Sequence, residues 1–235
     1  MAPSVIVVAS ETFAGTAARM IMAGIAAAIA ARGECGLALC GGSTPVLVYQ
    51  TLAASAIRWA NVAIYFGDER AVPPGHPDSN FRMAREALLD RVAIPVQRIH
   101  RMAAERQDVD AAATEYDRLL PPRLDLLLLG VGPDGHTASL FPNSSALLEV
   151  NRRVLAVAAP PPPLQPQVRR MTITPSVIAA ARQVLVMVAG ADKAALLARI
   201  LEGPDQPNTL PAQLARSGTW VLDQAAAGHL QQRDT

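Results

Sequence analysis

Short apolar segments alternate with longer stretches rich in alanine and leucine along most of the chain. The first segment, residues 4–9, is rich in β-branched residues and has the length of a strand. Residues 11–32 are rich in alanine and lack proline, which predicts a helix. Further strands are predicted at 36–40, 62–66, 124–129, 154–158, 170–173, 184–189 and 219–223. Further helices are predicted at 45–54, 80–89, 108–119, 175–181 and 193–201, and over the C-terminal alanines at 225–227.

This alternation of strands and helices predicts an α/β fold with a mostly parallel central sheet, arranged as a Rossmann-like three-layer sandwich. Segment 124–129 is almost wholly apolar, as expected for a strand that helices cover on both faces. The prolines at 160–163 predict a stiff loop, but the alternation continues on both sides of them. We therefore expect a single domain over residues 1–235.

The composition narrows the class of protein. The formal net charge is +1, so no strong field attracts the chain to nucleic acid or to a membrane surface. The uncharged run within the predicted first helix, 20–31, is 12 residues, whereas a membrane span needs ~20. No basic region precedes the first apolar segment, which argues against a signal peptide. Cys35 and Cys40 match no common zinc or redox spacing, so we expect two buried free thiols in a cytoplasmic protein.

Ligands of such sheets bind beyond the carboxyl ends of the strands, which directs attention to three loops. The first loop, 40–45, reads Cys-Gly-Gly-Ser-Thr-Pro between a strand and a helix. Gly41 and Gly42 allow the backbone to approach a ligand, Ser43 and Thr44 supply hydroxyl groups, and a helix N-terminus favours an anion. The alternative is an ordinary tight turn with a threonine cap.

The second loop, Gly67-Asp68-Glu69-Arg70, places three charges at the end of a strand. These charges fit either a solvated turn or a polar site. In isolation, the local sequence favours the turn.

The third loop, 129–137, contains the pattern G-x-G-x-x-G. A dinucleotide site also needs a helix here and an acidic residue at the next strand end, and the sequence provides neither. What remains is Asp134 two positions before His136. If the segment is extended, both side chains face the same way and form a candidate catalytic pair.

Two further cations stand out. Lys193 is the one lysine among 20 arginines and follows a predicted strand. Arg170 begins another predicted strand, and both residues fit either a phosphate site or a solvated surface. The remaining histidines, His76, His100 and His229, lie in contexts typical of loops or surfaces.

Together these segments resemble the 6-phosphogluconolactonase family, within the larger group that includes glucosamine-6-phosphate isomerase/deaminase. The resemblance follows family order over nearly the whole chain. It rests on Gly41-Gly42-Ser43-Thr44-Pro45, Phe66-Gly67-Asp68-Glu69-Arg70, His76-Pro77-Asp78-Ser79-Asn80, the segment 129–142, Arg170-Met171-Thr172-Ile173-Thr174, Gly190-Ala191-Asp192-Lys193 and Trp220-Val221-Leu222-Asp223.

Two positions separate this chain from the deaminase branch. That branch follows its Asp-Gly-His core with a motif that ends in Glu-Pro, whereas this chain has Phe141-Pro142. That branch also has a tyrosine at the position of Arg70. Both differences favour the lactonase.

The resemblance implies a carboxylic ester hydrolase that converts 6-phospho-D-glucono-1,5-lactone to 6-phospho-D-gluconate in the oxidative pentose phosphate pathway. His136 is expected to act as general base, Asp134 to orient it, Arg70 to stabilise the oxyanion, and Asp68 to bind a sugar hydroxyl or hold Arg70. The expected phosphate-binding residues are Gly41, Gly42, Ser43, Thr44, Arg170 and Lys193. We expect no metal, no cofactor, no nucleic-acid or membrane partner, and a monomer or weak homo-oligomer.

Two other functions remain possible on sequence grounds. The first is a sugar-phosphate isomerase/deaminase, but this chain lacks the glutamate of that branch, as described above. A non-catalytic sugar-phosphate sensor would keep the phosphate loop without the base, and such proteins usually carry a pair of DNA-binding helices that this sequence does not show.

Overall fold

Six parallel strands form the central sheet of the structure, a computed structural model that describes residues 3–231. Their order across the sheet is β1-β9-β8-β5-β2-β3. The strands are β1 (Ser4–Val8), β2 (Cys35–Leu39), β3 (Val62–Phe66), β5 (Leu126–Leu129), β8 (Val184–Val188) and β9 (Thr219–Asp223). All six coincide with predicted strands apart from small differences at their ends, and the α/β fold class is confirmed.

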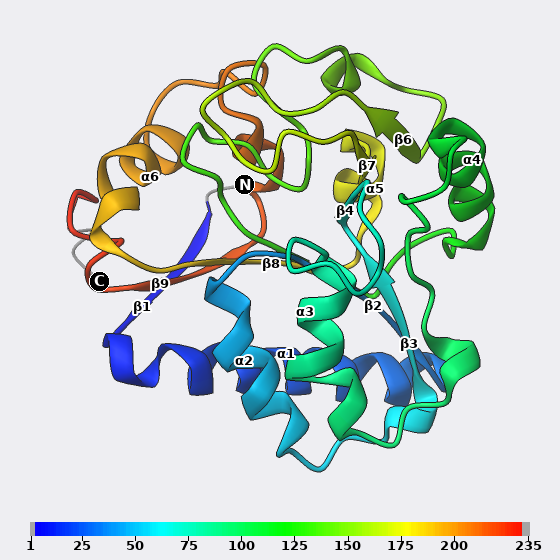
Figure 1. The fold of residues 1–235 in the computed structure, drawn as a ribbon. Helices are drawn as coiled ribbons and strands as arrows, with labels where there is room; N and C mark the ends of the chain where they lie inside the picture. The colour runs from blue at the N-terminus through cyan, green and yellow to red at the C-terminus, as the bar shows by residue number, and fades with distance from the viewer. Residues whose placement is uncertain (1–2, 232–235) are drawn as a thin grey trace.

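Helices cover both faces of this sheet (Figure 1). Below it in that view lie α1 (Ser10–Arg32), α2 (Thr44–Ala53) and α3 (Asn80–Ala87). Above it lie α5 (Pro175–Ala180), α6 (Ala194–Leu201) and a second, smaller sheet, against which α4 (Val109–Leu119) packs. These helices agree with the predicted ones, again with small differences at the ends.

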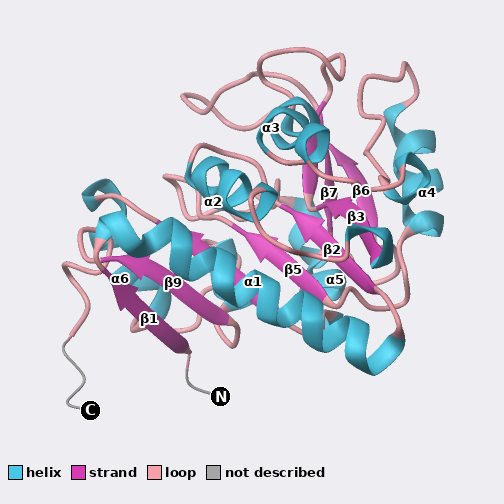
Figure 2. Ribbon diagram, turned by 90° about the horizontal axis from the view of Figure 1, so that it is seen from below, coloured by secondary structure: helices cyan, strands magenta, loops and turns pink. Residues whose placement is uncertain are grey.

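The longest helix, α1, has 23 residues and is apolar enough to span a membrane by length and composition. In this fold it packs against one face of the central sheet (Figure 2). Ala17, Ile21 and Ile25 on its inner face are almost completely buried. A side chain at Gly24 would meet Gln183 and Leu126, so the helix approaches the sheet closely. Its packing is that of a core helix.

The second sheet is antiparallel, in the order β4-β7-β6. It consists of β4 (Asp68–Arg70), β7 (Arg170–Ile173) and β6 (Val154–Val157). In the β4–β7 register, Asp68 lies opposite Thr172 and Arg70 lies opposite Arg170. The interpretation of Asp68–Arg70 as a solvated turn is therefore wrong. Backbone hydrogen bonds from Gly67 N to Leu39 O and from Ile173 N to Gly67 O carry the chain directly from one sheet into the other.

The predicted helix over the C-terminal alanines is also wrong, because residues 224–229 form turns. Asp223 caps a single turn of this segment. Its carboxylate accepts a hydrogen bond from Ala226 N at 2.7 Å, and its carbonyl accepts one from Ala227 N. The same carboxylate also binds Gly190 N and Ser10 Oγ, which ties the segment to β9. A segment this short does not offset the cost of helix nucleation.

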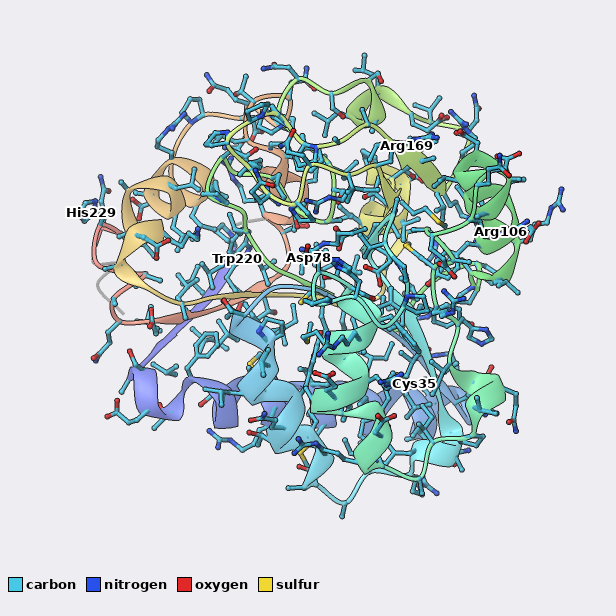
Figure 3. The ribbon with its side chains drawn as sticks, in the orientation of Figure 1. Cys35, Asp78, Arg106, Arg169, Trp220 and His229 are labelled. Carbon is cyan, nitrogen blue, oxygen red and sulfur yellow. The ribbon has the colours of Figure 1, made fainter. Side chains whose placement is uncertain are left out.

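Cys35 and Trp220 lie inside the fold, whereas Arg106 and His229 lie at its periphery (Figure 3). Cys35 and Cys40 are both buried free thiols, as predicted. Burial raises the pKa of each thiol to about 12, so both stay protonated and unreactive at neutral pH.

Candidate active site

The topology brings two of the three chemically interesting loops together. Chain connections run from β2 towards β3 on one side and from β5 towards β8 on the other, while β2 and β5 are neighbours. This is the switch point of the sheet, where ligands of open α/β folds bind. A pocket of about 520 Å³ lies there. Nine of the ten predicted site residues line it, namely Gly41, Gly42, Ser43, Thr44, Asp68, Arg70, His136, Arg170 and Lys193.

The glycine loop after β2 forms one wall of the pocket. Gly42 has φ of 97°, a conformation that favours glycine. A Cβ at Gly41 would lie 1.9 Å from Oδ1 of Asn80, so only glycine fits beneath that side chain. Helix α2 begins at Thr44 directly after this loop, so the loop lies at the positive end of the helix dipole.

The threonine cap considered from the sequence does not form. The N-cap of α2 is Ser43, and it makes no side-chain capping bond. Within residues 3–231, no hydrogen bond engages the hydroxyl of Ser43 or of Thr44. Both hydroxyls are therefore free to bind a ligand at the pocket wall.

The loop after β5 brings His136 and Asp134 together. Nδ1 of His136 lies 2.5 Å from Oδ1 of Asp134, and His136 N donates to the same oxygen at 3.1 Å. The expected extended segment is wrong, because Gly135 has φ of 88° and Gly135 N donates to Gly132 O in a tight turn. The pair is formed by this turn rather than by strand periodicity. Asp134 does not line the pocket, but it contacts His136, which does.

The hydrogen bond orders the imidazole. Burial by itself raises the pKa of the Asp134 carboxyl, but the hydrogen bond and the charge of His136 outweigh burial and lower it. Asp134 is therefore ionised at neutral pH and accepts a proton-bearing Nδ1. When the imidazole is neutral, this tautomer leaves a lone pair on Nε2.

Asp68 lies deep in the pocket floor with only 6% of its surface exposed. Its carboxylate accepts hydrogen bonds from Ser139 Oγ at 2.6 Å and from Asn80 Nδ2 at 2.9 Å. Its nearest cation is Arg170, with Nη1 at 4.0 Å. The alternative that Asp68 holds Arg70 is wrong, since Arg70 Nη1 donates instead to the carbonyl of Asp78 at 2.6 Å.

Two guanidinium groups therefore face the pocket from neighbouring strands. Arg170 is almost fully buried, and burial lowers its pKa, although Asp68 partly offsets this effect. Within the described residues, neither Nε of Arg70 nor Nε of Arg170 has a hydrogen-bond partner. Buried cations with free donors suit an anionic ligand or a developing negative charge.

Lys193 closes the site from the loop after β8. Its ammonium lies 3.2 Å from Asp192, a highly exposed carboxylate, and its own side chain is largely buried. The pocket therefore receives Lys193 and Arg170 from two segments, the loop after β8 and strand β7.

Several residues that organise the site are absent from the sequence-based prediction. Glu69 is buried and accepts hydrogen bonds from Ser79 Oγ and from backbone N–H groups at the start of α3, and burial raises its pKa. Asn80, Ser139 and Phe141 are buried around the predicted residues. Their motifs were noted in the sequence, but only folding shows which side chains they contact.

Within residues 3–231, no group of three or more His, Cys, Asp or Glu side chains is arranged to hold a metal ion. Of the other histidines, His76 and His229 are exposed, while His100 stacks on Tyr65 away from the pocket. The chemistry of the pocket therefore centres on His136 and the three cations.

Several known proteins are similar to this chain in sequence. The 6-phosphogluconolactonase of Mycobacterium tuberculosis is 38% identical over 239 residues, which cover 94% of this chain and 95% of that protein. The 6-phosphogluconolactonase of Synechocystis is 41% identical over 219 residues, covering 88% and 89%.

Solved structures agree in fold. The 6-phosphogluconolactonase from Trypanosoma cruzi matches with a TM-score of 0.87 and 30% identity, covering 99% of both chains. A monomeric glucosamine-6-phosphate deaminase matches with a TM-score of 0.83 but only 20% identity, covering 96% of this chain and 99% of that one, and so shows the fold alone.

The family model of glucosamine-6-phosphate isomerases and 6-phosphogluconolactonases matches residues 9–222, which include all of the pocket loops described above. The chain therefore belongs to the glucosamine-6-phosphate isomerase/6-phosphogluconolactonase family.

Proposed function

We propose that this protein is a 6-phosphogluconolactonase, a hydrolase that opens 6-phospho-D-glucono-1,5-lactone to 6-phospho-D-gluconate in the oxidative pentose phosphate pathway. The curated relatives named above carry that activity in their names. The observation that carries the proposal is His136, which is hydrogen-bonded to Asp134 and lines a pocket with three cations.

In the proposed reaction, Nε2 of His136 takes a proton from a water molecule as its oxygen attacks C1 of the lactone. The tetrahedral intermediate bears its negative charge on the former carbonyl oxygen, next to the guanidinium of Arg70. When the bond from C1 to the ring oxygen breaks, the imidazolium returns the proton to that oxygen. The product is a carboxylic acid with a free hydroxyl, and the acid ionises at neutral pH.

The remaining residues bind and orient the substrate. The phosphate lies on the N–H groups around Gly42 to Thr44, and Lys193 and Arg170 add charge-assisted bonds. Asp68 positions Arg170, because its carboxylate is already bound by two neutral donors and lies beside that guanidinium.

A coupled assay of lactone hydrolysis tests this proposal. The purified protein should accelerate formation of 6-phosphogluconate well above the spontaneous rate, and glucosamine 6-phosphate should release no ammonia. Phe141 contributes no carboxylate at the position where the deaminase branch has glutamate. Release of ammonia without lactone hydrolysis would assign the chain to the deaminase branch.

A further inference from the structure

Two residues that the proposed mechanism does not use contact the imidazole of His136. A Cβ at Gly132 would lie 2.0 Å from Cε1, 2.2 Å from Nδ1 and 2.6 Å from Nε2 of that ring. The ring of Phe141 has its centroid 4.9 Å from the imidazole centroid, at an interplanar angle of 59°. We call Gly132 and Phe141 the imidazole seat.

The His136 imidazole needs this imidazole seat because one hydrogen bond does not fix the plane of the ring. Rotation about the Cβ–Cγ bond of histidine is broad and roughly two-fold, so the ring can exchange its nitrogen and carbon edges. Asp134 binds Nδ1 alone, and Nε2 has no hydrogen-bond partner within the described residues. Packing against the ring must therefore supply the remaining orientation.

Phe141 also contacts a second site residue. The guanidinium carbon of Arg170 lies 5.7 Å from the centroid of the Phe141 ring, within the range of a cation–π interaction. Arg170 has other supports, since its Nη2 donates to the carbonyls of Gln165 and Pro166. Loss of the aromatic ring should therefore disturb the imidazole more than the guanidinium.

We propose that Gly132 and Phe141 are positioning residues that hold the His136 imidazole with Nδ1 on Asp134 and Nε2 towards the pocket. This inference rests on the proposed role of His136 as general base. Gly132 makes room for the ring, and Phe141 limits its rotation. Backbone conformation does not explain the glycine, since Gly132 does not adopt the left-handed conformation of Gly42 and Gly135.

A spectroscopic test uses the ligand-free protein, so it does not depend on the activity. The ¹⁵N chemical shifts of the His136 ring should indicate one tautomer, with the proton on Nδ1. Phe141→Leu should give a mixture of tautomers or orientations, and Phe141→Tyr, which keeps the ring, should restore the single form. Identical spectra for Phe141→Leu and the parent protein would overturn the proposal.

Phe81→Leu is a matched control for this experiment. Phe81 likewise has an arginine above its ring, with the guanidinium carbon of Arg101 at 5.9 Å, and it packs edge-on against Phe66. It does not line the pocket. Its substitution should leave the His136 resonances unchanged, and a shift as large as that of Phe141→Leu would contradict a local seat.

Kinetics provide a second readout. Phe141→Leu should lower kcat about tenfold or more, as expected for a misplaced base, and should change KM by less than about threefold. An effect confined to KM would show that Phe141 acts through its contact with Arg170, and would overturn the proposal. If the parent protein does not hydrolyse the lactone, the proposed function fails while the spectroscopic result stands by itself.

Gly132→Ala gives a test that remains valid if Phe141→Leu does not fold. The added methyl group would overlap the imidazole, so it should lower the unfolding midpoint of the parent protein. In the His136→Ala background the methyl group should occupy the space left by the ring, and the loss should largely disappear. An equal loss in both backgrounds would show that the methyl group meets something other than His136.

Discussion

The glycine-loop wall of the pocket and the floor around Asp68 differ in how firmly the protein holds their polar groups. In the glycine loop, the hydroxyls of Ser43 and Thr44 make no hydrogen bond within residues 3–231. On the floor, both carboxylate oxygens of Asp68 accept hydrogen bonds from buried donors, and Arg170 lies beside them. The wall leaves its hydroxyl donors available to a ligand. The floor uses its donors to hold a buried carboxylate in place.

This difference follows from the charges that the wall and the floor carry. The glycine loop offers partial charges of backbone N–H groups at a helix start, which water solvates at little cost. The floor buries a full positive charge, which must be balanced and hydrogen-bonded inside the protein. Substitutions on the floor should therefore affect stability, whereas removal of the Ser43 or Thr44 hydroxyl should affect only binding.

The largest effect is expected at His136, the proposed general base. His136→Ala should lower kcat by ~10²–10⁴-fold, because the attacking water loses its proton acceptor. The measurement is the coupled lactone assay, corrected for spontaneous hydrolysis. His229→Ala is the control, since His229 is exposed at the periphery of the molecule (Figure 3). Turnover near the parent level in His136→Ala would remove His136 from the mechanism.

The next effect concerns stability at the floor. Asp68→Ala should lower the free energy of unfolding by about 3 kcal/mol, because it leaves Arg170 buried without its carboxylate. Denaturant unfolding measures this change. Asp110→Ala is the matched control, because it breaks an ion pair with Arg169 in which both side chains are exposed. Surface pairs contribute only about 0–1 kcal/mol, so similar losses in both variants would contradict the distinct character of the floor.

Binding of the phosphate gives the third effect. Lys193→Ala should raise KM for the lactone about 10- to 100-fold, as expected for the loss of a charge-assisted hydrogen bond of about 1.5–3 kcal/mol, with kcat less affected. Lys193→Arg is the sharper variant, since a planar guanidinium does not replace a compact ammonium at such a site. An unchanged KM in Lys193→Ala would place this residue outside the phosphate site.

The smallest effect is expected in the glycine loop. Ser43→Ala should raise KM a few-fold, because a neutral hydrogen bond contributes only about 0.5–1.5 kcal/mol. The unfolding midpoint should not change, since the hydroxyl has no partner within the described residues. A clear fall in thermal stability would show that Ser43 supports the fold, and that the wall and the floor do not differ in this respect.

The sequence predicted the elements of this molecule well where the hydrophobic pattern is unambiguous. The strands of the central sheet consist mostly of apolar or β-branched residues, and packing of such residues needs no partner of a particular kind. Prediction failed at Asp68–Arg70 because a charged strand has no such pattern. It failed again at residues 225–227, where Asp223 caps a single turn and the segment is too short to continue as a helix.

Motif reasoning brought the ten site residues into view, but not their contacts. Sequence distance cannot show that Asp68 lies beside Arg170 rather than Arg70, since the pairing of β4 with β7 decides this. Likewise, Asp134 and His136 meet through a glycine turn and not through an extended segment. Each of these outcomes depends on interactions between residues brought together only by folding.

The sequence by itself determined the fold class, the loops that carry chemistry and the resemblance to one family, because these depend on local patterns and motifs. Only the tertiary structure decided which charges are paired and which donors are left for a ligand. It also revealed that Gly132 and Phe141 contact the imidazole. The physical reason is that burial and packing, which set the cost of every charge and the orientation of every ring, are properties of the assembled core.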